Sequence, residues 1–71
     1  MDLSKSLAKE IIARKHMTKV LGEEVSNNSK LLSHHDKEGV LIFTNEVTEK
    51  YYYFMIDDNG KIIVFKNFIM I

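Results

Sequence analysis

The sequence contains no cysteine and no proline, and its 71 residues include only three glycines. Without cysteine, the chain can form neither a disulfide nor a thiolate metal site. Without proline, it lacks proline-dependent kinks and linkers. The glycines at positions 22, 39 and 60 stand alone, which excludes a glycine-rich loop that cradles phosphate.

Long apolar stretches are also missing from the chain. No stretch approaches the roughly 20 apolar residues that span a membrane, and the N-terminus lacks the apolar run of a signal peptide. We therefore expect a cytoplasmic protein with no membrane association. Arginine is scarce, with one arginine beside nine lysines, and this bias is typical of AT-rich genomes such as those of low-GC bacteria, their phages and plasmids.

The length predicts a single small α+β domain over residues 1–71. Apolar residues make up 45% of the chain, an ordinary share for a globular protein. A chain this short buries only about 60% of the surface that its unfolded form exposes, so its stability is marginal without help. With disulfides excluded, oligomerisation is one of the remaining ways to supply that help.

The formal net charge is zero, but the charges are distributed unevenly. Residues 1–21 carry five basic and two acidic side chains, a net +3. Residues 22–49 carry two basic and six acidic side chains, a net −4, and residues 50–71 have a net +1. Local charge of this size can steer a partner even when the total is zero.

The first third of the chain is typical of one helix. Asp2 or Ser4 can cap its start, good helix formers follow, and Gly22 stands where a helix ends in the left-handed conformation. We predict a helix over Leu3–Leu21. The polar cluster at 26–29 predicts a turn or loop.

The rest of the chain is typical of strands and turns. The predicted strands cover residues 30–34, 40–44, 50–56 and 62–71, and Lys66 and Asn67 could interrupt the last one. The segments 36–39 and 57–60 predict turns, the second a tight hairpin turn because Asn-Gly tolerates positive φ, and 45–49 is a polar connection. The fold class is therefore α+β, with one N-terminal helix packed on a three- or four-stranded antiparallel meander.

The strands are apolar on both faces, although a sheet covered on one side should alternate apolar and polar residues. One helix can cover only one face, so a second copy, another protein or the segment 22–34 must cover the other. Tyrosine tolerates partial wetting better than phenylalanine. We therefore place Tyr51, Tyr53 and Met55 on the outer face. The side chains expected under the helix are Phe43, Phe54, Ile56, Ile63 and Phe65.

Arg14 interrupts the apolar stripe of the predicted helix, because it lies seven residues after Leu7 and seven before Leu21. Its stem could lie along apolar surface while the guanidinium reaches water or Glu10. The helix could instead break near residue 16, with Thr18 capping a second one. As a third alternative, Arg14 is a recognition residue at an interface, where arginine pairs at two points with carboxylates or phosphates.

Catalytic and metal-binding motifs have little support. His34 and His35 are neighbours on a predicted strand, so they point to opposite faces and share an ion poorly, even with Asp36 beside them. Asp57 and Asp58 lie at an exposed hairpin tip, where no dry pocket raises a pKa. We expect no metal, no cofactor and no enzymatic activity, since a chain this short has little room for a pocket.

The sequence favours a non-enzymatic protein-binding module, a small regulator or inhibitor that self-associates as a homodimer and docks on a protein partner. The candidate partner-binding residues are Arg14, Lys15, Tyr51, Tyr53 and Met55. The alternative is a nucleic-acid-binding module that uses the basic N-terminal helix and the Lys50–Phe54 strand. Against this alternative, the pI is near 6.8, and the glycine-containing aromatic signature of RNA-recognition strands is missing.

Overall fold

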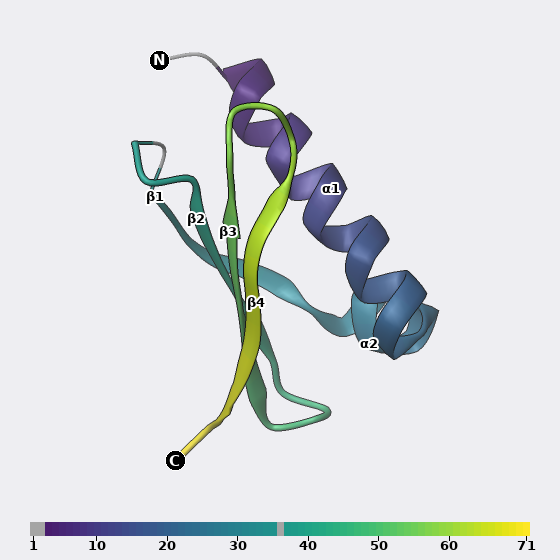
Figure 1. The fold of residues 1–71 in the computed structure, drawn as a ribbon. Helices are drawn as coiled ribbons and strands as arrows, with labels where there is room; N and C mark the ends of the chain where they lie inside the picture. The colour runs from purple at the N-terminus through teal and green to yellow at the C-terminus, as the bar shows by residue number, and fades with distance from the viewer. Residues whose placement is uncertain (1–2, 36) are drawn as a thin grey trace.

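The computed structural model describes residues 3–35 and 37–71, and the side chains of 8–35 and 37–71. The described chain forms two helices and a four-stranded antiparallel sheet in the order β1-β2-β3-β4 (Figure 1). The elements are α1 (Leu3–Leu21), α2 (Glu23–Asn28), β1 (Lys30–His35), β2 (Val40–Asn45), β3 (Lys50–Ile56) and β4 (Ile62–Ile69). The fold is α+β, as predicted, and its sheet is a meander. β4 ends at Ile69 without a break at Lys66 and Asn67.

The long helix α1 has the predicted bounds and is continuous. The break suggested near residue 16 is wrong, because Thr18 does not cap a new helix. Its hydroxyl donates to the Arg14 carbonyl one turn earlier, at 2.9 Å. The helix stops at Gly22, whose φ of 99° and ψ of 161° are open to glycine but differ from the left-handed helical conformation expected there.

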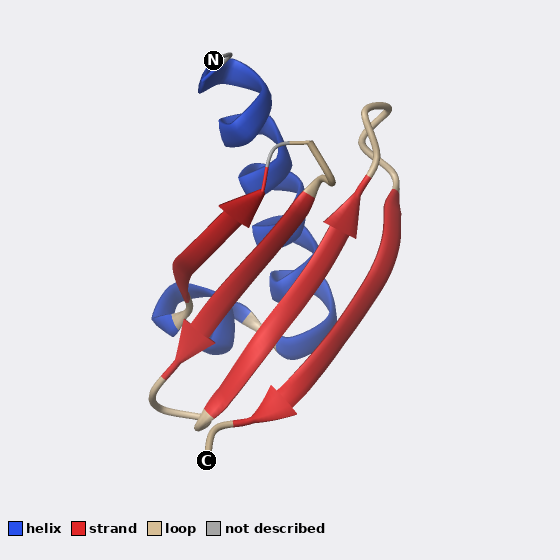
Figure 2. Ribbon diagram, turned by 90° about the vertical axis from the view of Figure 1, so that its left-hand side faces the viewer, coloured by secondary structure: helices blue, strands red, loops and turns tan. Residues whose placement is uncertain are grey.

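The segment after Gly22 differs from the loop that the sequence predicted, because α2 continues through Asn28. Asparagine and serine side chains at the end of this short helix donate hydrogen bonds to its own carbonyls. The Asn28 amide donates to the Glu24 carbonyl at 2.8 Å, and the Ser29 hydroxyl donates to the Val25 carbonyl at 2.8 Å. Both helices lie on the same side of the sheet (Figure 2). The segment 22–34, which forms α2 and most of β1, therefore leaves the second face of the sheet uncovered.

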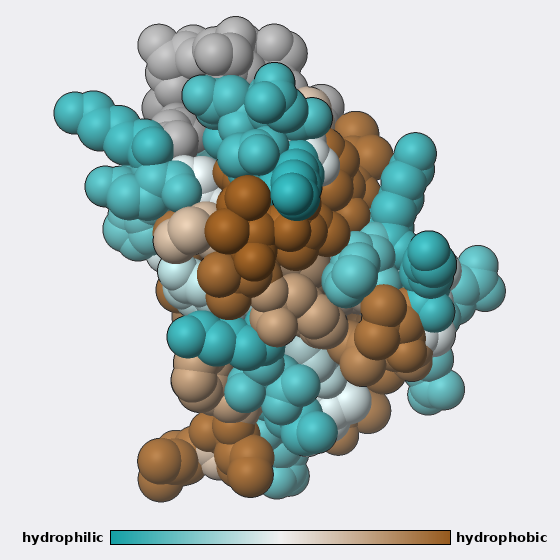
Figure 3. All heavy atoms as spheres, in the orientation of Figure 1, coloured by the Kyte–Doolittle hydropathy of each residue, from teal (hydrophilic) through white to brown (hydrophobic). Residues whose placement is uncertain are grey.

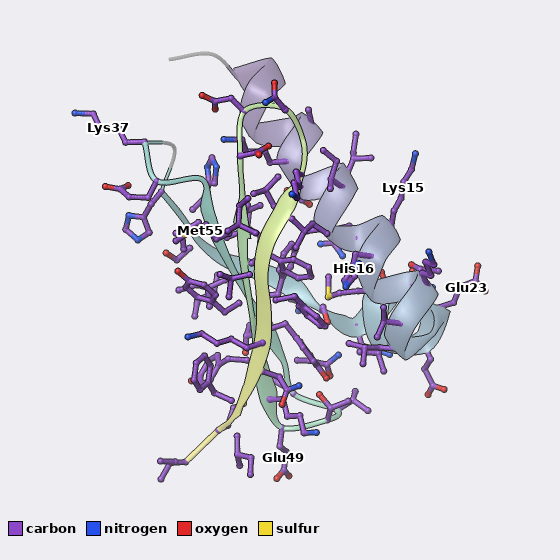
Figure 4. All side chains as sticks on the ribbon, viewed as in Figure 1. Lys15, His16, Glu23, Lys37, Glu49 and Met55 are labelled. Carbon is purple, nitrogen blue, oxygen red and sulfur yellow. The ribbon has the colours of Figure 1, made fainter. Side chains whose placement is uncertain are left out.

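The main core lies between α1 and the face of the sheet that it covers, which we call the inner face. α1 contributes Ala13 and Met17, both fully buried. His16 also faces the sheet (Figure 4), with its ring 4.9 Å from Phe65 and 6.0 Å from Phe54 between centroids. The buried side chains that the sheet contributes to this core are Leu41, Phe43, Tyr52, Phe54 and Ile56, and Phe65 packs against them.

Ile63 is the one residue misplaced among those expected under the helix. Its side chain is 53% exposed, whereas Ile62 packs against the core. The pairing of β3 with β4 shifts here, because Met55 pairs with Val64 and Ile56 with Ile62. Ile63 is therefore the extra residue of a β-bulge, and such a bulge reverses the faces of the residues that precede it.

The turn at 57–60 is confirmed as a tight hairpin. The Asp57 amide donates to the Lys61 carbonyl at 2.9 Å, and the Gly60 amide donates to the Asp57 carbonyl at 3.0 Å. Gly60 has a φ of 83°, and Asn59 is not among the residues with positive φ. The loop is thus a three-residue turn closed by a left-handed glycine rather than a two-residue Asn-Gly turn. Of the other predicted turn, Lys37 to Gly39 form a turn, and Asp36 lies outside the described residues.

Candidate interaction surfaces

The second face of the sheet, which we call the outer face, carries no helix (Figure 2). Tyr53 lies at its centre, paired with Ile42 on one side and Lys66 on the other. Strand alternation and the observed register place twelve side chains on this face. They are Lys30, Ser33, His35, Val40, Ile42, Thr44, Tyr51, Tyr53, Met55, Val64, Lys66 and Phe68.

Aliphatic and aromatic side chains dominate the centre of the outer face. The two central strands contribute only uncharged residues to it, and Tyr51, Tyr53 and Met55 are there as predicted. These three are half-buried, because neighbours on adjacent strands pack against one another. Phe68 at the edge is 49% exposed. The result is an apolar surface that no other element of the described chain covers.

The charges of the outer face lie on its two edge strands and are all basic. Lys30 belongs to β1 and Lys66 to β4, and His35 also lies on β1. None of the twelve outer-face residues is acidic. The Lys66 ammonium lies 5.3 Å from the ring centroid of Tyr53 and 5.5 Å from that of Phe68. These distances are within the range of cation–π attraction.

The exposed edge of β4 carries further apolar side chains, of which Ile63 and Ile69 are 53% and 73% exposed. In the space-filling view, hydrophilic side chains separate the apolar surface on this side of the molecule into patches (Figure 3). Scattered apolar residues of this kind are normal on a protein surface. The outer face, by contrast, is contiguous, because its residues are direct neighbours in the register.

Arg14 makes several contacts within the chain. Its Nε donates to Glu10 Oε2 at 3.0 Å, so the interpretation that the guanidinium reaches Glu10 is confirmed. Its Nη1 donates to the carbonyls of Ser26 and Ser29, both at 3.0 Å. The guanidinium carbon also lies 5.2 Å from the ring centroid of Phe43. Arg14 therefore ties α1 to the end of α2, where helix carbonyls lack partners inside the helix.

Asn45 is a buried polar residue that the sequence interpretation assigned only to a connection. It is 0% exposed at the end of β2. Its Nδ2 donates to the Val25 carbonyl at 3.0 Å and to Ser29 Oγ at 3.1 Å, and its Oδ1 accepts from the Thr48 amide at 2.9 Å. The only sequence signal was a polar residue at the end of an apolar strand. Asn45 joins α2, β2 and the following turn.

A shallow groove of about 500 Å3 runs between α1 and α2. Lys15 extends from α1 away from the sheet (Figure 4). The lining residues are Ile11, Arg14, Lys15, Thr18, Lys19, Ser26 and Asn27, and none of them is acidic. The five candidate partner-binding residues thus divide between two surfaces. Arg14 and Lys15 lie at the groove, and Tyr51, Tyr53 and Met55 lie on the outer face.

The structure does not bring the candidate catalytic and metal-binding residues Asp57, Asp58, His34 and His35 together in one site. Asp57 Oδ1 accepts from the amides of Asn59 and Lys61 at 2.9 and 2.8 Å, which shapes the hairpin turn. Asp58 accepts from Lys9 Nζ at 3.2 Å. His34 and His35 occupy successive positions of β1, opposite Leu41 and Val40.

The described residues, 3–35 and 37–71, include neither a candidate metal site nor a membrane-spanning helix. Among these residues there is no group of three or more His, Cys, Asp or Glu side chains placed to hold a metal ion. Neither described helix combines the length and the apolar character needed to cross a membrane.

Comparisons with known proteins identify no relative of this chain. No protein-family model matches it, and no curated protein and no solved structure is significantly similar to it.

Proposed function

We propose that the protein is a cytoplasmic, non-catalytic regulator or inhibitor that self-associates. It forms a homodimer in which two outer faces pack together. The observation that supports this proposal is the uncovered apolar face of the sheet, with Tyr53 at its centre. A second copy is the occupant that we favour, because the size of the face and its uncharged centre both suit it.

The size of the face is sufficient for a small dimer interface. Four strands spaced about 4.8 Å apart, each about six residues of about 3.3 Å, give a flat footprint near 400 Å2. Side chains roughen such a surface, so each copy would bury about 600 Å2 and the pair about 1,200 Å2, the lower end of the range for specific interfaces. Two sheets can pack in this way with their strands about 30° apart.

The positions of the charged side chains leave the centre of the outer face free for packing. Interfaces usually combine an apolar core rich in tyrosine and methionine with a polar rim. Here Tyr51, Tyr53 and Met55 lie on a central strand, whereas Lys30 and Lys66 lie on the edge strands. The long lysine stems can lie along the interface while the ammonium groups stay in water. No charge then needs to be buried without a partner.

The thermodynamics of a short chain point in the same direction. A domain of 71 residues has little core with which to offset chain entropy. Dimerisation raises the stability of the folded state by mass action, because only folded chains associate. Covering the outer face of each copy would also remove an apolar surface that otherwise favours indiscriminate association.

One observation favours a second candidate function on the same face, the binding of single-stranded nucleic acid. The outer face combines three aromatic rings, Tyr51, Tyr53 and Phe68, with Lys66 and without a carboxylate. Stacking of bases on aromatic side chains beside basic groups is how many single-strand binders work. The two candidates compete for one surface, so a single set of experiments separates them.

The decisive experiment measures mass in solution by analytical ultracentrifugation at micromolar protein concentration. We expect twice the chain mass of 8.3 kDa. Ile42→Glu places a carboxylate beside Tyr53 at the centre of the face and should give a folded monomer. The matched control is Val47→Glu, because Val47 is 67% exposed in the β2–β3 turn, and this variant should remain dimeric. Circular dichroism checks that both variants fold.

Oligothymidylate and oligouridylate, followed by fluorescence anisotropy at several salt concentrations, test the second candidate. A dimer that binds neither oligonucleotide supports the proposal. A monomer that binds them with a steep salt dependence replaces it with nucleic-acid binding, because phosphate contacts release counterions. A wild-type monomer that binds neither oligonucleotide overturns both candidates. If Ile42→Glu does not fold, the wild-type mass alone decides.

A further inference from the structure

We propose that the groove between α1 and α2 binds a helix of another protein, one that presents an apolar side chain next to two carboxylates one turn apart. The groove lies on the helical side of the sheet, opposite the outer face. It would stay accessible when two outer faces pack together. The proposal therefore goes beyond the homodimer and does not depend on it.

The spacing of the groove residues on α1 suits an α-helix as the occupant. Ile11, Lys15 and Thr18 follow one another at intervals of four and three residues, so they form a stripe along one side of α1. From Ile11 to Lys19 the stripe is about 12 Å long, or about two helical turns. Helices that dock in grooves use anchors at these same intervals.

Ile11 supplies an apolar anchor point in the groove. It is 46% exposed on α1, although residues one and two positions further along, Ile12 and Ala13, pack toward the core. An apolar side chain of a partner could cover Ile11 and lie against the stems of the neighbouring lysines. Removing apolar area from water in this way provides the attraction.

The charge of the groove defines the chemistry of the partner. Lys15 and Lys19 are exposed, and the ion pairs of the described residues involve neither of them. Arg14 adds a third positive charge, which Glu10 compensates in part. The two lysines are one turn apart, so carboxylates one turn apart on a partner helix can approach both. Complementary charge of this kind selects partners and speeds their association.

A docked strand fits this groove less well than a helix. Strand addition needs free backbone groups at a sheet edge, and the groove is bordered by two helices. The carbonyl of Ser26, which lines the groove, already accepts from Arg14. The surface therefore offers side chains, which a partner helix can contact without any backbone pairing.

The test is an NMR titration of the full chain with a synthetic, hydrocarbon-stapled helical peptide. The peptide carries a leucine followed, at the next two helical turns, by two glutamates one turn apart. A second peptide has glutamine in place of each glutamate. We expect the amide signals of Ile11, Lys15, Thr18 and Asn27 to shift with the glutamate peptide, while that of Tyr53 on the outer face stays in place. Added salt and the glutamine peptide should both weaken the binding.

The double variant Lys15→Glu/Lys19→Glu should reduce peptide affinity roughly tenfold, since two exposed charge pairs are reversed. The matched control, Lys37→Glu/Lys61→Glu, makes the same change of charge at exposed lysines of the β1–β2 and β3–β4 connections. It should bind as the parent does. Equal losses in both double variants would show attraction by net charge alone and overturn the proposal.

Three further results would also overturn the proposal. They are the absence of binding at millimolar peptide, equal binding of the glutamine peptide, and signal shifts confined to the outer face. Oligothymidylate that shifts the groove signals more strongly than the glutamate peptide would assign the groove to nucleic acid instead. Ultracentrifugation of the Lys15→Glu/Lys19→Glu variant should still give the wild-type mass. A failure of this inference is thus distinguishable from a failure of the homodimer.

Discussion

The two faces of the sheet are built from the same strands and from similar residues, yet only one of them is covered. On β3, Tyr52 and Phe54 of the inner face are 2% and 0% exposed. Their neighbours Tyr51 and Tyr53 point to the outer face and are half-buried. The difference lies in the partners, because α1 covers one face and no described element covers the other. Residue type indicates the faces only in part, because Tyr52 is buried on the inner face whereas Tyr51 and Tyr53 lie on the outer one.

The largest expected effect comes from removing an aromatic ring from each face in turn. Phe54→Ala should lower the free energy of unfolding by about 3–5 kcal/mol, because it leaves a cavity in a fully buried site. Tyr53→Ala should lower it by about 1 kcal/mol in the monomer, since the ring keeps contact with water. Urea unfolding at protein concentrations below the dimer range measures both values.

The same pair of variants also tests the homodimer. At higher protein concentration the cost of Tyr53→Ala should increase, because the dimer adds stability that this variant loses. The loss of unfolding free energy caused by Phe54→Ala should be the same at low and at high protein concentration. Equal costs for the two variants in dilute solution would mean that the outer face is as well packed as the inner one, and the comparison between faces would fail.

A second difference between the faces is the buried asparagine that closes one end of the inner face. Asn45→Leu should lower the free energy of unfolding by about 2–3 kcal/mol, because three polar groups around the side chain would each lose a hydrogen bond. Those groups are the Val25 carbonyl, Ser29 Oγ and the Thr48 amide.

Asn67→Leu is the matched control for this experiment. Asn67 is exposed on β4, opposite Tyr52, and the change should alter the free energy of unfolding by less than about 0.5 kcal/mol. Thermal and urea unfolding measure both variants. If Asn45→Leu is as stable as the parent, the hydrogen bonds of Asn45 make no net contribution.

The sequence predicted most of the backbone, because local patterns are strong in this chain. Continuous good helix formers followed by Gly22 defined α1, and the β-branched and aromatic run Lys50–Ile56 defined β3 with its observed bounds. The turn residues Asp57 to Gly60 defined the hairpin. In these segments, local propensity and the final fold agree.

The details that could not be predicted depend on contacts between distant segments. Ile62 and Ile63 are the same residue type, and only the register with β3 decides which one faces the core. Arg14 was recognised as an anomaly in the helix, but the carbonyls of Ser26 and Ser29 that receive its hydrogen bonds belong to a segment that was expected to be a loop. No local pattern specifies these partners.

The smallest expected effect is that of a substitution at Arg14. This substitution discriminates between two explanations for an arginine on this side of α1. A helix pattern alone predicts that Arg14→Leu leaves stability equal or higher, since leucine suits the apolar stripe. The contacts to Glu10, Ser26 and Ser29 predict the opposite. We expect a loss of about 1–2 kcal/mol, moderate because the side chain is 34% exposed and water can replace some of the lost hydrogen bonds.

Two further variants identify the source of this loss. Arg14→Lys keeps the charge and an aliphatic stem but cannot reproduce the planar fork, so its stability should fall between those of the parent and Arg14→Leu. Lys15→Leu changes an exposed neighbour and should stay within about 0.5 kcal/mol of the parent. Urea unfolding of the three variants gives the order. If Arg14→Leu is instead at least as stable as the parent, the internal contacts do not explain an arginine at this position. Its role as a recognition residue then becomes the stronger hypothesis, to be tested through binding at the groove.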